Sequence, residues 1–390
     1  MSQLGTYKCS CGSGKQYRKC HLGRKYSPYE NPNAPIDVIE AANKFARPPL
    51  ESFEKDGSLV GRPFIETIHK GKRARAVGGT VHLRPVDEPF HQFILDLFGT
   101  AIGYDWIAKE RVKEEKDRHP LSLWGQEMVE MIIQAKVQQG PNKLFKVEQT
   151  GNMRVLLAMA YDYYSLSHCS AKIQPEFIKK LKNKDGFQGA RYEMAVAGIA
   201  VRAGFEITWI NTKGKHCEFI GKHKQTGEIV YFECKSHTRE GILGKNGTFD
   251  PEKTRIKILD HFREAVEQTD KQYPLVIFDD LNLPITPDVD PAQRAWHLQV
   301  EEAFEKYGFY KDKKYKETNY GALVITNFSW HYHRELTRMK ENELITYFHI
   351  NGQYSLRPET IALLKTGAEQ YGFVPPRLEE VTSDTAMDTM

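Results

Sequence analysis

The sequence lacks a long apolar run, a secretory leader and the cysteine pattern of a disulfide-stabilised protein. No apolar stretch in its 390 residues approaches the length of a membrane span, and its first residues lack the hydrophobic segment of a signal peptide. The 6 cysteines form no regular framework, because Cys9, Cys11 and Cys20 cluster near the start and the others are scattered. These absences predict a cytoplasmic protein that does not bind a membrane.

Strong net charge is also absent. The chain has 55 Lys and Arg residues against 51 Asp and Glu residues, a formal net charge of +4. This balance permits nucleic-acid binding without requiring it. The length suffices for roughly two or three domains with a proper core.

Residues 1–30 carry a pattern typical of a small zinc module. Cys9 and Cys11 are separated by one residue, and Cys20 and His21 follow, so three thiolates and an imidazole are available for a tetrahedral site. So short a segment has no core, and a bound metal would supply its folding energy. The pattern resembles the SEC-C zinc module, which implies a structural Zn²⁺ and a docking surface for a protein partner. The alternative is a tail of reduced cysteines.

Residues 31–60 are rich in proline and are predicted to be a linker, and residues 61–89 to be a basic β-hairpin region. In the hairpin, two runs of β-forming residues flank Gly78-Gly79. Its cations are candidates for contacts with nucleic-acid phosphates: Lys70, Lys72, Arg73 and Arg75. The alternative is a strand edge that its charges protect from pairing with another chain.

The spacing of apolar residues and the polar stretches predict the structure of several further segments. Residues 90–184 show helical spacing with charged or Gly/Pro breaks, with one helix over 90–111, and predict an α-helical domain. Asp279-Asp280 ends an apolar run and is interpreted as a solvated strand end, with a second metal site as the alternative. Residues 344–348 and 354–356 are expected to form a last strand pair, and the polar segment 375–390 to be a disordered tail.

The segment 187–237 carries the most informative pattern. A helix is predicted over 190–203, and strands over 205–210, 216–222 and 228–235. The helix carries Glu193, the second strand Glu218, and the third strand Glu233 and Lys235. Residues i and i+2 of a strand share a side, so Glu233 and Lys235 point the same way, and a hairpin allows Glu218 to lie near Glu233.

These residue types suit metal-assisted hydrolysis. Two neighbouring carboxylates bind a hard divalent cation such as Mg²⁺ or Mn²⁺. A lysine beside them can orient a water molecule or stabilise charge on a phosphate. The alternative is a strand with surface charges in an ordinary α/β domain.

The order of a helix with an acid, a strand with an acid and a strand with Glu-x-Lys resembles the PD-(D/E)xK, or restriction-endonuclease-like, nuclease superfamily. The resemblance implies an α/β (α+β) fold with a mixed central sheet flanked by helices, with an α-β-β-β-α-β core over 185–330 and an extension over 331–374. It implies that Glu193, Glu218, Glu233 and Lys235 are catalytic. Most members carry Asp after Pro where this chain has Glu218 after Cys217.

The resemblance also implies the role of each residue. Glu218, Glu233 and the backbone carbonyl of Cys234 would hold Mg²⁺ or Mn²⁺, Lys235 would activate or orient water, and Glu193 would position the metal or its water shell. The predicted function is a metal-dependent nuclease that hydrolyses phosphodiester bonds of nucleic acid, with DNA favoured over RNA as the substrate. The alternative is a non-catalytic adaptor that keeps the fold and binds protein or nucleic acid through the zinc module and the hairpin.

Overall fold

The computed structural model describes residues 65–374, apart from 70, 78–79, 140–146, 148, 168–172, 211–213, 251–253, 285–292, 307–318, 334–342 and 349–353. The predicted zinc module, linker and tail lie outside the described residues. No described helix is both long enough and apolar enough to cross a membrane.

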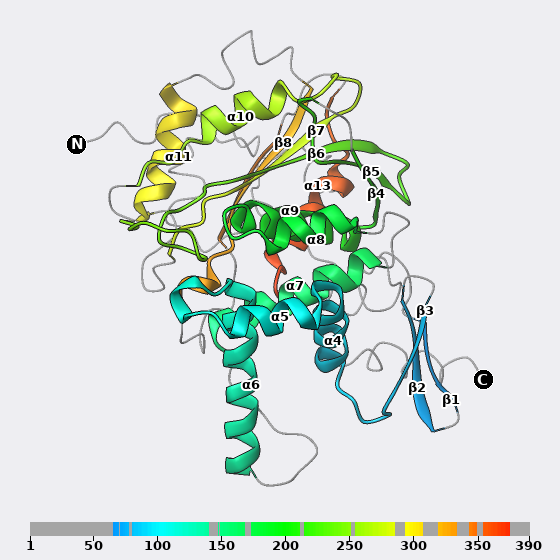
Figure 1. Cartoon of the computed structure of the whole chain (residues 1–390). Helices are drawn as coiled ribbons and strands as arrows, with labels where there is room; N and C mark the ends of the chain where they lie inside the picture. Colours follow the sequence, from blue (N-terminus) through cyan, green and yellow to red (C-terminus); the bar gives the residue numbers. More distant parts are fainter. Residues whose placement is uncertain are drawn as a thin grey trace.

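A mixed sheet of six strands forms the centre of the protein, in the order β4-β5-β6-β7-β8-β9 (Figure 1). Strands β4 to β6 are antiparallel, β6 to β8 are parallel, and β9 returns antiparallel to β8. The strand bounds are Phe205–Trp209, Phe219–His223, Ile229–Ser236, Leu275–Asp280, Tyr320–Asn327 and Glu343–Phe348. The predicted mixed central sheet is therefore confirmed.

The central strands are buried on both faces. Every residue of β7 and β8 is buried, as expected for parallel strands with helices on both sides. Successive residues of β6 divide between two apolar cores: Phe232 and Cys234 belong to one, and Tyr231 to the other. The period of two in a strand therefore decides which helices each side chain of β6 meets.

Helices cover the two faces of this sheet (Figure 1). One apolar core joins one face to α7 (Gly151–Ser167), α9 (Phe187–Arg202) and α13 (Pro358–Glu369). The second core joins the other face to α10 (Ile258–Val266) and α11 (Ala295–Lys306). The order along the chain is thus α9, β4, β5, β6, α10, β7.

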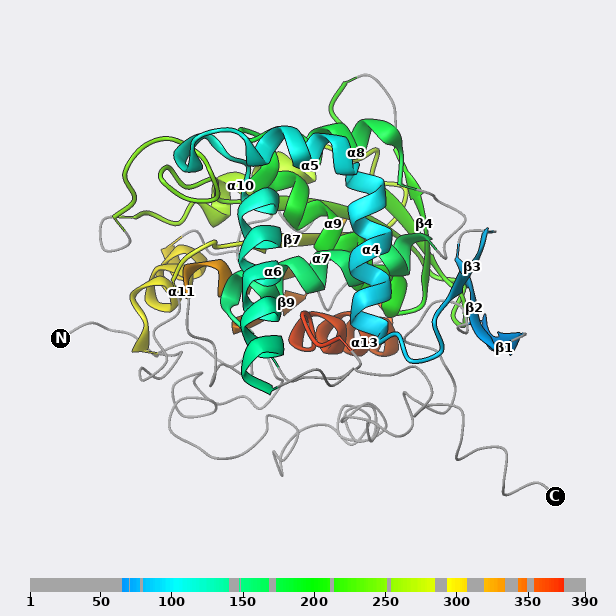
Figure 2. The ribbon, with the colours of Figure 1, turned by 60° about the horizontal axis from the view of Figure 1, so that its bottom comes forward.

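The first core extends beyond α7 into an outer layer of helices (Figure 2). This layer contains α4 (Phe90–Ile102), α5 (Tyr104–Arg111) and α6 (Pro120–Gln139), while α8 (Pro175–Lys182) packs directly on α9. Phe90, Phe93 and Trp124 share one buried cluster with α9 and β6. The helices over 90–184 are thus continuous in packing with the sheet.

Three local expectations need correction. The single helix predicted over 90–111 is divided at Gly103, which has a φ of 92°. Residues 354–356 are not a strand, and the helix α13 that follows them was not predicted. A separate antiparallel sheet contains β1 (Ile65–His69), β2 (Lys72–Val77) and β3 (Thr80–Arg84), so the predicted hairpin has a third strand.

Candidate metal-dependent active site

Helix α9 carries Glu193, whose exposed fraction is 8%. The two carboxylate oxygens of Glu193 lie 2.5 and 2.7 Å from Nζ of Lys180 on α8. Burial raises the pKa of Glu193 to about 7, and the nearby Glu218 carboxylate adds to this effect, while Lys180 opposes it. Lys180 was not a predicted site residue, because it stands in a lysine-rich helix where nothing distinguishes it from its neighbours.

Strand β6 carries Glu233 and Lys235 on the same face. Glu233 is 1% exposed, and its Oε1 lies 2.9 Å from Nζ of Lys235. Its other oxygen, Oε2, is buried without a hydrogen-bond partner. Burial raises the pKa of Glu233 to about 7; Lys235 opposes the rise, whereas Glu218 and Glu193 add to it. A buried carboxylate oxygen without a donor is an open position for a cation.

Lys235 also contacts Glu264 on α10 and Gln268, which follows this helix. Nζ of Lys235 donates to Oε1 of Gln268 at 2.6 Å and lies 3.7 Å from Oε2 of Glu264. Gln268 is fixed in turn, because its Nε2 donates to the backbone carbonyl of His216 at 3.0 Å. Neither Gln268 nor Glu264 was a predicted site residue. Both contacts depend on how α10 docks on the sheet, which no local pattern shows.

Glu218 lies directly before β5, where β5 and β6 separate. Its backbone N–H donates to the carbonyl of Phe232 at 3.0 Å, and the last paired residues are Phe219 and Phe232. Backbone groups alternate along a strand, so the carbonyl of Cys234 points to the same edge of β6 as that of Phe232, beyond the last pair. The carboxylate of Glu218 is near enough to raise the pKa of both Glu193 and Glu233.

The structure therefore brings the four predicted catalytic residues into one charged neighbourhood. Their fit to a divalent cation rests on three features: the partnerless Oε2 of Glu233, the raised pKa of Glu193 and Glu233, and the Cys234 carbonyl beyond the last pair with β5. The first and third features are oxygen atoms that are open to a ligand. The raised pKa means that the neighbouring positive groups do not fully compensate the burial of the two carboxylates. Hard divalent cations prefer oxygen ligands of this kind. Glu193 is the most constrained member, since Lys180 already contacts both of its carboxylate oxygens.

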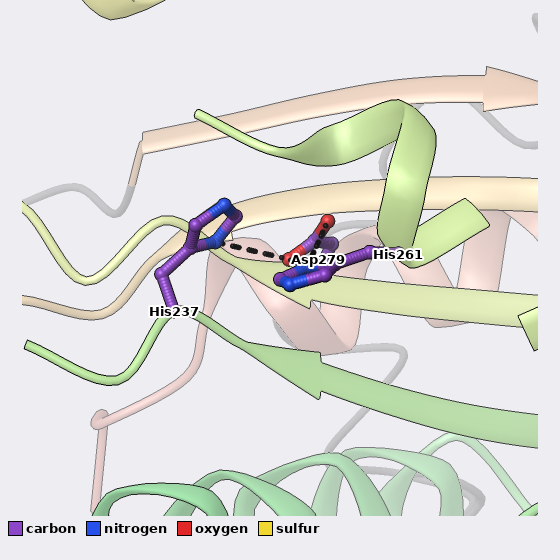
Figure 3. A group of neighbouring side chains, drawn as sticks. All are labelled: His237, His261 and Asp279. Atoms are coloured by element: carbon purple, nitrogen blue, oxygen red, sulfur yellow. Dashed lines mark hydrogen bonds and ion pairs between the residues drawn. The ribbon is translucent and has the colours of Figure 1, made fainter. Parts of the chain in front are cut away.

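A second cluster contains His237, His261 and Asp279 (Figure 3). Their ligand-type atoms all lie within 4.8 Å of one another, and among the described residues no other trio of His, Cys, Asp or Glu meets this criterion. The carboxylates of Glu193, Glu218 and Glu233 are thus neighbours without forming so tight a trio. These two histidines and Asp279 come from three different segments, so no pattern in the sequence connects them.

The interpretation of Asp279-Asp280 as a solvated strand end is wrong. Both residues are 0% exposed, because β7 is a central strand with helices on both faces. Asp280 forms a fully buried ion pair with Arg191 of α9 at 3.2 Å, and Asp279 lies between the two histidines. These partners lie far away in the sequence, so the apolar run before Asp279 gave no sign of them.

The basic hairpin does not present its arginines to solvent. Nε and an Nη atom of Arg73 donate to the carbonyl of Val86, and Arg75 forms an ion pair with Glu88 at 3.2 Å. Their exposed fractions are 8% and 4%. Lys72 is exposed, and Lys70 lies outside the described residues. Arg73 and Arg75 thus attach the hairpin to the segment before α4, a position that does not favour phosphate contacts by these two side chains.

Comparison of the chain with models of known families, with curated proteins and with solved structures gave no match.

Proposed function

We propose that the protein is a metal-dependent nuclease that hydrolyses phosphodiester bonds, with DNA as the preferred substrate. The main support for this proposal comes from the buried carboxylate of Glu233. One of its oxygens forms an ion pair with Lys235, the other has no hydrogen-bond partner, and its pKa is raised to about 7. Perturbed carboxylates with a specific charged partner concentrate at functional sites. Most buried carboxylate oxygens in folded proteins accept a hydrogen bond, so the partnerless Oε2 of Glu233 favours a functional role.

The connectivity supports the proposal. The order α9, β4, β5, β6, α10, β7 is the α-β-β-β-α-β order of the PD-(D/E)xK superfamily. The candidate residues occupy corresponding positions: Glu193 on the helix, Glu218 directly before the second strand, and Glu233 and Lys235 on the third. Such a core over 185–330 accounts for both the mixed sheet and the position of the charged residues.

Each residue has a distinct role in the proposed reaction. Glu218, Glu233 and the Cys234 carbonyl would hold Mg²⁺ or Mn²⁺, which supplies charge stabilisation at the phosphate and favours ionisation of a water molecule. The ammonium group of Lys235, fixed by Glu233 and Gln268, orients the attacking water and stabilises negative charge on the phosphate. Glu193, held by Lys180, accepts a hydrogen bond from water at the edge of the site.

The adaptor alternative is favoured by one observation. Glu193 and Glu233 each have a lysine partner, Lys180 and Lys235 respectively. A protein that only keeps the fold would retain these ion pairs to compensate its buried carboxylates. Such a protein would bind nucleic acid or a partner protein through the zinc module without cutting anything.

The deciding experiment measures cleavage and metal affinity on the same preparations. Linear, circular and single-stranded DNA, and RNA, are each incubated with Mg²⁺ or Mn²⁺. Glu233→Ala should lose Mg²⁺ affinity, because one anionic ligand is gone. Lys235→Ala should retain the metal and lose about two to four orders of magnitude in turnover.

Asp260→Asn is the matched control. Asp260 is an exposed residue of α10 whose carboxylate lies 3.6 Å from Arg263, so this variant should behave as the parent. If Lys235→Ala cuts as fast as the parent, the proposed mechanism is wrong. If the parent cuts no substrate, and Mg²⁺ binding does not depend on Glu233, the adaptor alternative replaces the nuclease.

A further inference from the structure

The His237–Asp279–His261 cluster is continuous with the candidate active site. Glu233, Lys235 and His237 follow one another at a spacing of two along β6 and its end, so they share a face. Asp279 of β7 is the register partner of Lys235. His261 stands on α10 one turn before Glu264, whose carboxylate contacts Lys235. The cluster and Lys235 therefore lie side by side under the same helix.

Hydrogen bonding fixes the proton position on His237. Nε2 of His237 accepts the backbone N–H of Lys257 at 2.9 Å, so in the neutral ring the proton is on Nδ1. Nδ1 lies 3.1 Å from the carbonyl of Asp280 and 3.4 Å from Oδ1 of Asp279, both acceptors. A metal on Nδ1 would move this proton to Nε2, where it would meet the Lys257 donor. His237 is thus suited to hydrogen bonding and unsuited to metal ligation.

Asp279 orients His261 in a similar way (Figure 3). Nδ1 of His261 lies 3.0 and 3.1 Å from the two carboxylate oxygens of Asp279. Burial alone would raise the pKa of Asp279, but His237 and His261 outweigh it and lower this pKa, so the carboxylate is ionised and accepts from both rings. The His261 side chain remains 17% exposed. Its Nε2 has no partner among the described residues and is the open end of the network.

We propose that His261 is the general acid of the reaction and that Asp279 is its positioning residue. This inference rests on the proposed nuclease function. As the water oxygen forms its bond to phosphorus, the bond from phosphorus to the leaving oxygen breaks, and that oxygen takes the Nε2 proton of His261. The attacking water releases its proton to solvent, from which His261 is protonated again. Asp279 stabilises the positive charge of the ring, as a buried carboxylate does for a catalytic histidine.

The test compares two leaving groups. When DNA is cleaved, a sugar oxygen leaves as an alkoxide, which needs a proton. When bis(p-nitrophenyl) phosphate is cleaved, the leaving group is p-nitrophenolate, a stable anion that needs no proton. His261→Asn is the decisive variant, since its amide can still donate to Asp279 near the Nδ1 position but has no atom at Nε2. We expect it to lose about two orders of magnitude or more in kcat on DNA, and no more than a few-fold on the aryl ester.

Two further variants separate this role from the others. Lys235→Ala should lose activity on both substrates, because it acts on the phosphate and water rather than on the leaving group. Asp279→Asn should repeat the selective loss on DNA, to a smaller extent, because Nε2 remains but is poorly oriented. Asp260→Asn, on the outer side of α10, serves again as the control.

Three results would overturn the inference alone while leaving the nuclease in place. These are an unchanged rate of His261→Asn on DNA, an equal loss on both substrates, or binding of Co²⁺ that His261→Asn abolishes, which would identify a metal centre. If the parent protein cleaves neither DNA, RNA nor the aryl ester, the proposed function itself fails and the inference falls with it.

Discussion

Replacing Glu233 by Gln should make the metal-free protein more stable at alkaline pH and leave it little changed at acidic pH. Glu233 is 1% exposed, and its pKa is about 7 in the folded protein against an ordinary value of 4.5. A carboxyl whose pKa is raised on folding lowers the free energy of unfolding once pH exceeds the unfolded value, and the full cost is reached above the folded value. That difference corresponds to about 3 kcal/mol.

The assay is urea denaturation of the parent and of Glu233→Gln at pH values from about 4.5 to 8.5, in buffer freed of Mg²⁺ by a chelating resin. The gain in the free energy of unfolding should grow from near zero at about pH 4.5 to about 3 kcal/mol above pH 7, with most of the rise between these two pKa values. Glu267→Gln is the control, because the Glu267 side chain is 67% exposed. Adding Mg²⁺ at pH 8 should stabilise the parent and leave the Gln variant unaffected.

A flat stability difference across this pH range would refute the reasoning, since it would mean that the Glu233 carboxylate is not desolvated as its burial implies. A rise in stability of Glu267→Gln over the same range would show that general surface charge, rather than the site, produces the effect. Stabilisation of Glu233→Gln by Mg²⁺ would show that Mg²⁺ binding does not require the Glu233 carboxylate.

The remaining predictions address the zinc module, the hairpin and the buried ion pair. Cys11→Ser should release one bound Zn²⁺, and metal analysis that finds the same zinc content in parent and variant would contradict the predicted site. Arg75→Gln should lower the free energy of unfolding by about 1–3 kcal/mol, because the buried Glu88 carboxylate then keeps only Arg84 as its ionic partner, without changing the salt dependence of DNA binding; a flatter salt slope would restore the phosphate role. Arg191→Met should cost about 3–5 kcal/mol in urea denaturation, because the buried carboxylate of Asp280 loses its cation, and a loss below 1 kcal/mol would contradict this.

Local sequence pattern predicted the elements that carry the site. Short runs of β-forming residues located β4, β5 and β6 to within a few residues, and helical spacing located α9. These predictions succeed because neighbours along the chain determine which side of a helix or strand each residue occupies. The same reasoning placed Glu233 and Lys235 on one face, and the structure confirms their contact at 2.9 Å.

Local pattern was insufficient at the ends of elements. Asp279 and Asp280 look like a polar strand end in sequence, yet both are fully buried. Their cost of burial is offset by partners from other elements, Arg191 for Asp280 and two histidines for Asp279. Arg73 and Arg75 present the same problem in reverse, since a basic run that looks exposed instead holds the hairpin to the segment before α4.

The sequence by itself determined the elements that carry the site, the shared side of Glu233 and Lys235, and the chemistry that these residue types permit. Tertiary structure alone decided the partners of the site residues. Lys180 contacts Glu193, Gln268 contacts Lys235, and Asp279 contacts His261, which the sequence did not single out. The physical reason is that each of these contacts depends on strand register and helix docking between distant segments. Register and docking follow from how both apolar cores pack at once, a property of the whole chain that no short window of residues contains.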